Sequence, residues 1–341
     1  MGRTAAPPPP AHSAMSLLSA AIEGHPILSC AAAGVVSVYI FLKIKSKTGK
    51  KPGKWRSPCA TDIVPYRKGD PVWTVDPKGI GTVRVAATGI ASLQPKTLND
   101  LFAAAKALFP DKPAMKVERE GAWVTYTWSE YYSGSERVAK SLIALGLAPH
   151  DCVNIIGFNS PEWFMAQMGA ILMGGKAAGV YTTNEAEACK YVAEHSEARV
   201  VFVEDAKQLT KYLSFCSDLP ALKKLVMWTG SVPAAQASQY SLDWASYLAL
   251  GVDVSSSAVA ERSRQVLPGH CATLIYTSGT TGNPKAVMIS HDNMIYESIV
   301  SMDGAPSRQL NRRRSPPPPL PSHPIPHLLS RFVGPYGYDF I

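Results

Sequence analysis

The sequence lacks the cysteine patterns that build small domains held together by disulfides or zinc. Its six cysteines include no CxxC pair, and no histidine lies at zinc-ligand spacing from any of them. It also lacks Asn-x-Ser/Thr sequons, because Asn159-Ser160-Pro161 fails at its third position. These absences give no sign of passage through the secretory lumen, so we expect reduced cysteines in a cytosolic body.

The body of the chain also lacks an excess of positive charge. The 341 residues carry a net charge of +8, but seven cations lie between residues 43 and 56 and five between 305 and 341. Residues 57–304 carry 21 Lys and Arg against 24 Asp and Glu. A nucleic-acid-binding domain places its positive patch on the folded body. We therefore expect no nucleic-acid partner.

An uncharged apolar run occupies residues 27–42 near the amino terminus. A helix of this length spans ~24 Å at ~1.5 Å per residue, against about 30 Å of hydrocarbon core, and snorkelling of Lys43 extends its reach. The cations at 43–56 follow at once, and the positive-inside rule then places the body on the cytoplasmic side. The alternatives are a helix lying in the membrane interface and a buried core helix.

The sequence thus predicts five segments. We interpret them as a proline-rich disordered amino terminus (1–26), a transmembrane anchor (27–42), a basic juxtamembrane linker (43–69), a globular body (70–304) and a disordered or misframed tail (305–341). We expect the anchor to lie in the endoplasmic reticulum membrane. The tail contains an RxxPxxP spacing at Arg313, Pro316 and Pro319, which SH3 domains read, but so proline-rich a stretch produces this spacing by chance.

Short apolar strands and capped helices alternate along the body. Apolar and polar residues alternate over 117–126 on both sides of Glu120-Gly121, a pattern typical of a β-hairpin. Thr127 with Glu130 forms a capping box. Ser160 and Asn184 are expected to cap two further helices. The sequence predicts strands at 153–158, 178–181, 200–203 and 225–228, and helices at 128–145, 161–174, 185–195 and 206–215. Such alternation builds a doubly wound α/β fold, in which helices cover both faces of a parallel sheet.

The motif that carries chemistry is TLIYTSGTTGNPKAVMIS at residues 273–290. Its two glycines let the backbone approach an anion, its hydroxyls donate hydrogen bonds, and Lys285 supplies charge. Pro284 precedes this lysine and an apolar stretch follows it, so the motif is a strand, a loop and a second strand rather than a Walker loop and a helix. The sequence therefore predicts a phosphate-binding loop and argues against a P-loop kinase.

This motif resembles the signature loop of the adenylate-forming enzymes. Residues 158–163, 179–184 and 195–198 are similar to the long-chain fatty acyl-CoA synthetases, most of all to the bubblegum type, and Pro71-Val72-Trp73-Thr74 fits that type too. The resemblance implies that a fatty carboxylate attacks Mg-ATP to give acyl-adenylate, from which the CoA thiol displaces AMP. It also implies which residues hold the phosphates: Thr277, Ser278, Gly279, Thr280, Thr281, Gly282 and Lys285, with Lys285 as the catalytic cation and Thr280 as the contact of Mg²⁺.

Three neighbours of the motif receive only structural roles. We expect Asn184 to be a helix cap, Trp163 a core or interface aromatic, and Cys271 a buried thiol. Ala286 stands where the family usually has glycine, which matters only if the backbone there needs a positive φ.

The motifs that the family places after the helix near His291 do not follow in this sequence. We therefore expect an incomplete large domain of the adenylate-forming type that is inactive alone. The alternative is a non-catalytic membrane-anchored isoform that acts through its proline-rich tail.

Overall fold

The computed structural model describes residues 74–83, 93–277 and 283–303. The expected anchor at 27–42, the linker at 43–69 and the tail at 305–341 lie outside these ranges. Among the described residues, no helix is long and apolar enough to cross a membrane.

A seven-stranded sheet forms the centre of the fold, and its strand order is β7-β6-β5-β3-β4-β8-β9. Neighbouring strands run parallel from β7 to β8, and β9 runs antiparallel to β8. The strands are β3 (Cys152–Ile156), β4 (Lys176–Val180), β5 (Ala198–Val203), β6 (Lys224–Met227), β7 (Ser241–Asp243), β8 (Cys271–Thr277) and β9 (Lys285–Ser290). All five residues of β3 are buried, as expected of a central strand in a sheet covered on both faces. The prediction of a parallel α/β sheet is confirmed.

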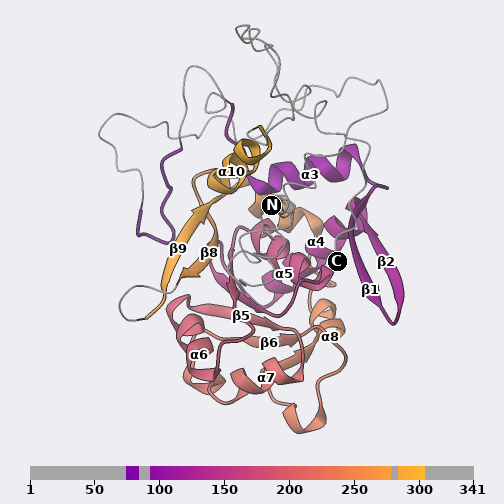
Figure 1. Cartoon of the computed structure of the whole chain (residues 1–341), viewed down its shortest axis with the longest axis vertical. Coiled ribbons are helices and arrows are strands. Elements are labelled where there is room, and N and C mark those ends of the chain that lie inside the picture. Colours follow the sequence, from indigo (N-terminus) through magenta and orange to yellow (C-terminus); the bar gives the residue numbers. More distant parts are fainter. Residues whose placement is uncertain (1–73, 84–92, 278–282, 304–341) are drawn as a thin grey trace, which may run out of the picture.

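Helices cover both faces of this sheet (Figure 1). α5 (Pro161–Leu172) connects β3 to β4 and packs with α4 (Trp128–Ala144) on one face. α6 (Ala186–His195) and α7 (Ala206–Leu213) follow β4 and β5 and cover the opposite face. The strand order therefore reverses between β3 and β5, and the carboxyl ends of these two strands form the switch point at which such sheets bind ligands.

Local sequence signals explain where several elements begin and end. Thr127 and Glu130 form the predicted capping box of α4, and Ser160 caps α5 ahead of Pro161. β1 (Pro113–Arg119) and β2 (Ala122–Thr127) form the predicted hairpin, with positive φ at both turn residues, Glu120 and Gly121.

The prediction that Asn184 caps a helix is wrong. The N-cap of α6 is Glu185, one residue later, and it makes no side-chain capping bond. Asn184 instead uses its carbonyl oxygen to accept a 2.7 Å hydrogen bond from Lys211 Nζ on α7. The backbone of Asn184 therefore joins the loop after β4 to the neighbouring helix.

Several further helices and turns complete the described part of the fold. They are α3 (Leu98–Leu108), α8 (Trp244–Ala249), α9 (Ser256–Arg264) and α10 (His291–Asp303), together with the 3-10 turns η2 (Cys216–Asp218) and η3 (Ala234–Gln236). Only α10 was expected, from the helix start near His291. α3 and α10 lie side by side (Figure 1), where the Leu98 N–H donates a 3.2 Å hydrogen bond to His291 Nδ1.

Candidate phosphate-loop site

The predicted phosphate loop connects two antiparallel strands at the end of the sheet. β8 pairs with β4 on one side and with β9 on the other. Its apolar residues are buried from Cys271 to Leu274, which ties the strand into the core ahead of the motif. Thr277, the last residue of β8, lies opposite Lys285, the first residue of β9. The predicted arrangement of strand, loop and strand is confirmed.

The structure places two of the seven predicted phosphate ligands. Thr277 is half-buried at the carboxyl end of β8, and Lys285 is exposed directly across the hairpin. Ser278, Gly279, Thr280, Thr281 and Gly282 lie outside the described residues, and with them the predicted contact of Thr280 to the metal. The hairpin therefore brings together one hydroxyl and one cation at the two ends of the motif.

Ala286 adopts a conformation that any residue tolerates. It lies inside β9, where it pairs with Tyr276, and it is absent from the residues with positive φ. The replacement of the family's usual glycine by alanine therefore causes no backbone strain at this position.

Helix α6 contacts both ends of the hairpin loop. The Tyr191 hydroxyl donates a 2.9 Å hydrogen bond to the carbonyl oxygen of Pro284, the residue before Lys285. His195 Nδ1 lies 2.9 Å from the hydroxyl of Tyr276, the residue before Thr277. The rings of Tyr191 and His195 stack on each other, with centroids 5.6 Å apart.

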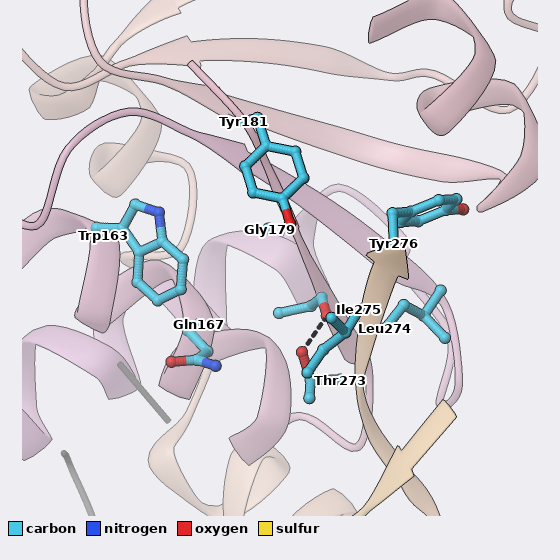
Figure 2. Close-up of a pocket in the computed structure, with 9 residues that line it drawn as sticks. Trp163, Gln167, Gly179, Tyr181, Thr273, Leu274, Ile275 and Tyr276 are labelled. Carbon is cyan, nitrogen blue, oxygen red and sulfur yellow. Dashed lines mark hydrogen bonds between the residues drawn. The ribbon is translucent and has the colours of Figure 1, made fainter. Parts of the chain in front are cut away.

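A pocket lies beside the hairpin at the carboxyl ends of β4 and β8. Figure 2 shows Trp163 and Gln167 of α5 on one side of it, with Gly179 and Tyr181 of the β4 end nearby. The Thr273 hydroxyl donates a 2.7 Å hydrogen bond to the Ala177 carbonyl oxygen and so holds β8 against β4 at the pocket floor. The full lining consists of Trp163, Gln167, Ala177, Gly179, Tyr181, Thr273, Leu274, Ile275 and Tyr276. Trp163 is thus a buried aromatic, as expected, that also faces a pocket.

Burial keeps the ionisable groups of β8 neutral. It raises the pKa of the Cys271 thiol to about 11, and the prediction that Cys271 is a buried thiol is confirmed. Burial also raises the pKa of Tyr276 well above its usual range, so its hydroxyl remains available for hydrogen bonding to His195. Lys285 is therefore the charge that the described part of the hairpin offers to an anion.

Sequence reasoning missed the contribution of α6 to this site. Tyr191 and His195 lie four residues apart and so share one helix face, which is a signal that the sequence contains. Their hydrogen bonds, however, reach residues 276 and 284, which are more than 80 positions away. Only the sheet order, which brings β8 next to β4, places this face against the hairpin.

The comparisons with known proteins agree with this geometry. A family model described as AMP-binding enzyme matches residues 102–318. The chain belongs to the AMP-binding enzyme family.

Two curated relatives of the chain are named as fatty acid CoA ligases. The chain is 41% identical over 231 residues to Long-chain-fatty-acid--CoA ligase ACSBG2 of Gallus gallus, a match that covers 67% of this chain and 30% of that protein. It is 36% identical over 225 residues to Long-chain-fatty-acid--CoA ligase ACSBG1 of Bos taurus, covering 66% and 30%. The resemblance to the bubblegum type is thus confirmed, and the chain spans about 30% of the length of these relatives.

A solved structure supports the fold. The crystal structure of a provisionally named long-chain-fatty-acid CoA ligase from Rhodopseudomonas palustris is 22% identical. It covers 62% of this chain and 49% of that one, with a TM-score of 0.50. The matched part of this chain therefore shares the fold of that structure.

Proposed function

We propose that this chain contains the ATP-phosphate-binding part of a long-chain fatty acid:CoA ligase. The observation that carries the proposal is the β8–β9 hairpin, which places Thr277 opposite the exposed Lys285 at the two ends of the Ser/Thr/Gly motif. Membership of the AMP-binding enzyme family and the fatty acid CoA ligases among the relatives support it.

The proposed reaction has two steps. A fatty carboxylate oxygen attacks the α-phosphorus of ATP, the bond to the β-phosphate oxygen breaks, and acyl-adenylate and pyrophosphate form. The CoA thiol then loses its proton and attacks the acyl carbon, and AMP leaves to give acyl-CoA. Negative charge grows on the departing pyrophosphate in the first step, so a fixed cation and hydroxyl donors lower its barrier.

Within this scheme Lys285 and Thr277 act at the departing phosphates. Lys285 is the first residue of β9, which pairs with β8. Its backbone is therefore held in the sheet, whereas its side chain is exposed to solvent. The Thr277 side chain is half-buried at the opposite strand end and offers a hydroxyl.

Mg²⁺ would neutralise phosphate charge in this reaction, as it does in other phosphoryl and nucleotidyl transfers. The described residues contain no group of three or more His, Cys, Asp or Glu that can hold a metal. Thr280 remains the proposed contact through the resemblance alone, and we derive no step from it.

The complete reaction is proposed for the whole ligase rather than for this chain by itself. The relatives are about three times as long as the matched segment, since the match covers 30% of each. We propose that the 341-residue chain forms no acyl-CoA from palmitate, Mg-ATP and CoA. A coupled assay of AMP release measures this, and turnover by the purified chain would contradict it.

Calorimetric titration of the purified chain with Mg-ATP and with pyrophosphate tests the phosphate site. Lys285→Ala should weaken both affinities, and Lys285→Arg should retain part of them because the cation remains. Lys223→Ala is the matched control, since Lys223 is an exposed lysine next to the amino end of β6, which four strands separate from β9 in the sheet. Equal affinities for Lys285→Ala and the control would remove Lys285 from the site.

In a full-length ligase carrying this sequence, Lys285→Ala should slow adenylation far more than it weakens fatty acid binding. The reason is that the additional negative charge on the departing pyrophosphate develops in the transition state. Fatty-acid-dependent exchange between ATP and pyrophosphate measures this step.

We also propose that residues 27–42 attach the protein to the endoplasmic reticulum membrane, with the body in the cytosol. The apolar run and the seven cations behind it support this. Deletion of residues 1–56 should release the protein from carbonate-washed membranes, and its retention there would count against a single anchor.

A further inference from the structure

We infer that Tyr191 and His195 are positioning residues that fix the two ends of the phosphate loop from one face of α6. This inference rests on the proposed function, because it concerns how that loop is held for its task. Neither residue belongs to the signature motif, and both lie more than 80 positions before the residues they contact.

The first contact acts on the lysine end of the loop. The Tyr191 hydroxyl donates to the Pro284 carbonyl oxygen at 2.9 Å, and that carbonyl shares its peptide plane with the Lys285 N–H. Fixing this plane fixes the direction in which the chain enters β9 and therefore the base of the Lys285 side chain. The ring of Pro284 also restricts its own φ, so the backbone at this end of the loop has few accessible conformations.

The second contact acts on the threonine end. Tyr276 is buried, and its hydroxyl lies 2.9 Å from His195 Nδ1 and 3.5 Å from the Val192 carbonyl oxygen, both on α6. The edge-to-face packing of the His195 and Tyr276 rings, with centroids 5.7 Å apart, adds to this contact. Thr277 follows directly, so the residue that precedes it is anchored by a buried ring and a hydrogen bond.

The two contacts are joined into one unit. Tyr191 and His195 lie one helical turn apart, and their rings stack with an interplanar angle of 29°. Tyr191 of α6 and Ala286 and Met288 of β9 are all packed against the same apolar cluster on this side of the sheet. A shift of α6 would therefore move both ends of the loop together.

Tyr191→Phe tests the first contact with the least disturbance. It deletes the hydroxyl that reaches Pro284 and keeps the ring that stacks on His195. We expect Mg-ATP affinity to fall about three- to tenfold, which corresponds to the net value of one hydrogen bond. Tyr240→Phe is the matched control, because Tyr240 is a half-buried tyrosine of the same apolar cluster next to β7, at the other edge of the sheet.

His195→Ala and His195→Asn test the second contact. Alanine removes the partner of the Tyr276 hydroxyl, whereas the asparagine amide can replace Nδ1 in a hydrogen bond. We expect His195→Ala to weaken Mg-ATP binding and His195→Asn to restore part of the affinity. A merely structural role would lower the unfolding midpoint of both variants and leave affinity at low temperature unchanged.

Amide hydrogen exchange gives a readout that needs no nucleotide. In Tyr191→Phe we expect faster exchange in peptides covering 271–277 and 283–290, with exchange unchanged in β3 and β5. Unchanged exchange at both loop ends would overturn the inference.

The possible failures are distinguishable. If Lys285→Ala weakens Mg-ATP binding but Tyr191→Phe and His195→Ala bind as wild type, the positioning role is wrong and the proposed function stands. If Lys285→Ala binds as wild type, the proposed function is wrong and the positioning role falls with it.

Discussion

A fall in pH from 7.5 to 5.5 should destabilise the folded chain through two histidines, the half-buried His270 just before β8 and the buried His291 just after β9. His291, at the start of α10, is buried, and its Nδ1 accepts the Leu98 N–H at 3.2 Å. Nδ1 of His270 accepts the Leu267 N–H at 3.1 Å. In each ring an unprotonated Nδ1 therefore accepts a hydrogen bond from a backbone N–H. Protonation of Nδ1 would place two N–H donors face to face and break this hydrogen bond.

The environment of both rings opposes a positive charge. Burial, with the neighbouring His150 ring, lowers the pKa of His270 to about 4, and burial, with His270, lowers the pKa of His291 to about 3. The rings of His150 and His270 meet edge to face with centroids 4.8 Å apart. Burial also lowers the pKa of His150, assisted by the nearby cation of Lys176.

The sign and size of the effect follow from these values. Well above pH 6.5 both histidines are neutral in the folded and the unfolded chain, so they do not change the free energy of unfolding. As the pH falls through 6.5, the unfolded chain binds protons that the folded chain does not. The free energy of unfolding therefore decreases as the pH is lowered, down to about pH 4 for His270 and about pH 3 for His291. Between pH 7.5 and 5.5 each histidine should remove on the order of 1 kcal/mol, so the two together should remove a few kcal/mol. That is a large part of a typical stability of ~5–15 kcal/mol.

Urea unfolding followed by tryptophan fluorescence at pH 7.5, 6.5 and 5.5 measures this loss. His270→Asn and His291→Asn keep an acceptor for the backbone donor but cannot titrate, so each should remove about half of the pH dependence and the double variant most of it. A wild-type stability that is constant over this range, or a double variant with the full dependence, would refute the reasoning.

Three further predictions concern packing, capping and thiol chemistry. Gly169→Ala should lower the free energy of unfolding by about 1–3 kcal/mol in the same assay, because the added Cβ would lie 2.5 Å from Val138 Cγ1 between α5 and α4. Thr127→Ala should cost about 1 kcal/mol by removing the capping box of α4. Cys152 and Cys271 should react with a thiol reagent only after unfolding, since both are buried and burial raises their pKa to about 12 and about 11. Mass mapping of the modified cysteines checks this.

The sequence predicted elements best where a local chemical signal marks their ends. Thr127 with Glu130, Ser160 with Pro161, and the Glu120-Gly121 turn each specify geometry within four residues, and all three are confirmed. The N-cap at Asn184 failed because α6 begins one residue later, at Glu185, which makes no side-chain capping bond. The backbone carbonyl of Asn184 accepts a tertiary hydrogen bond from Lys211 that no local signal indicates.

The order of strands was not available from local signals. Alternation of strands and helices implies a parallel sheet, but it does not say that β8 lies next to β4 or that β9 closes the described sheet in the antiparallel direction. That order determines which helix lies beside the motif. It also explains why the pocket joins Trp163 and Gln167 to residues that are more than 100 positions away.

For the candidate site, too, the sequence predicted the local chemistry but not the tertiary contacts. The motif identifies its own chemistry, because glycine, hydroxyl and lysine at this density are what a phosphate needs. It does not say what holds the ends of the loop, since the Pro284 carbonyl and the Tyr276 hydroxyl find their partners on α6. A substitution on that helix face should therefore alter nucleotide binding while the motif itself stays intact, and sequence comparison restricted to the motif would not reveal the cause.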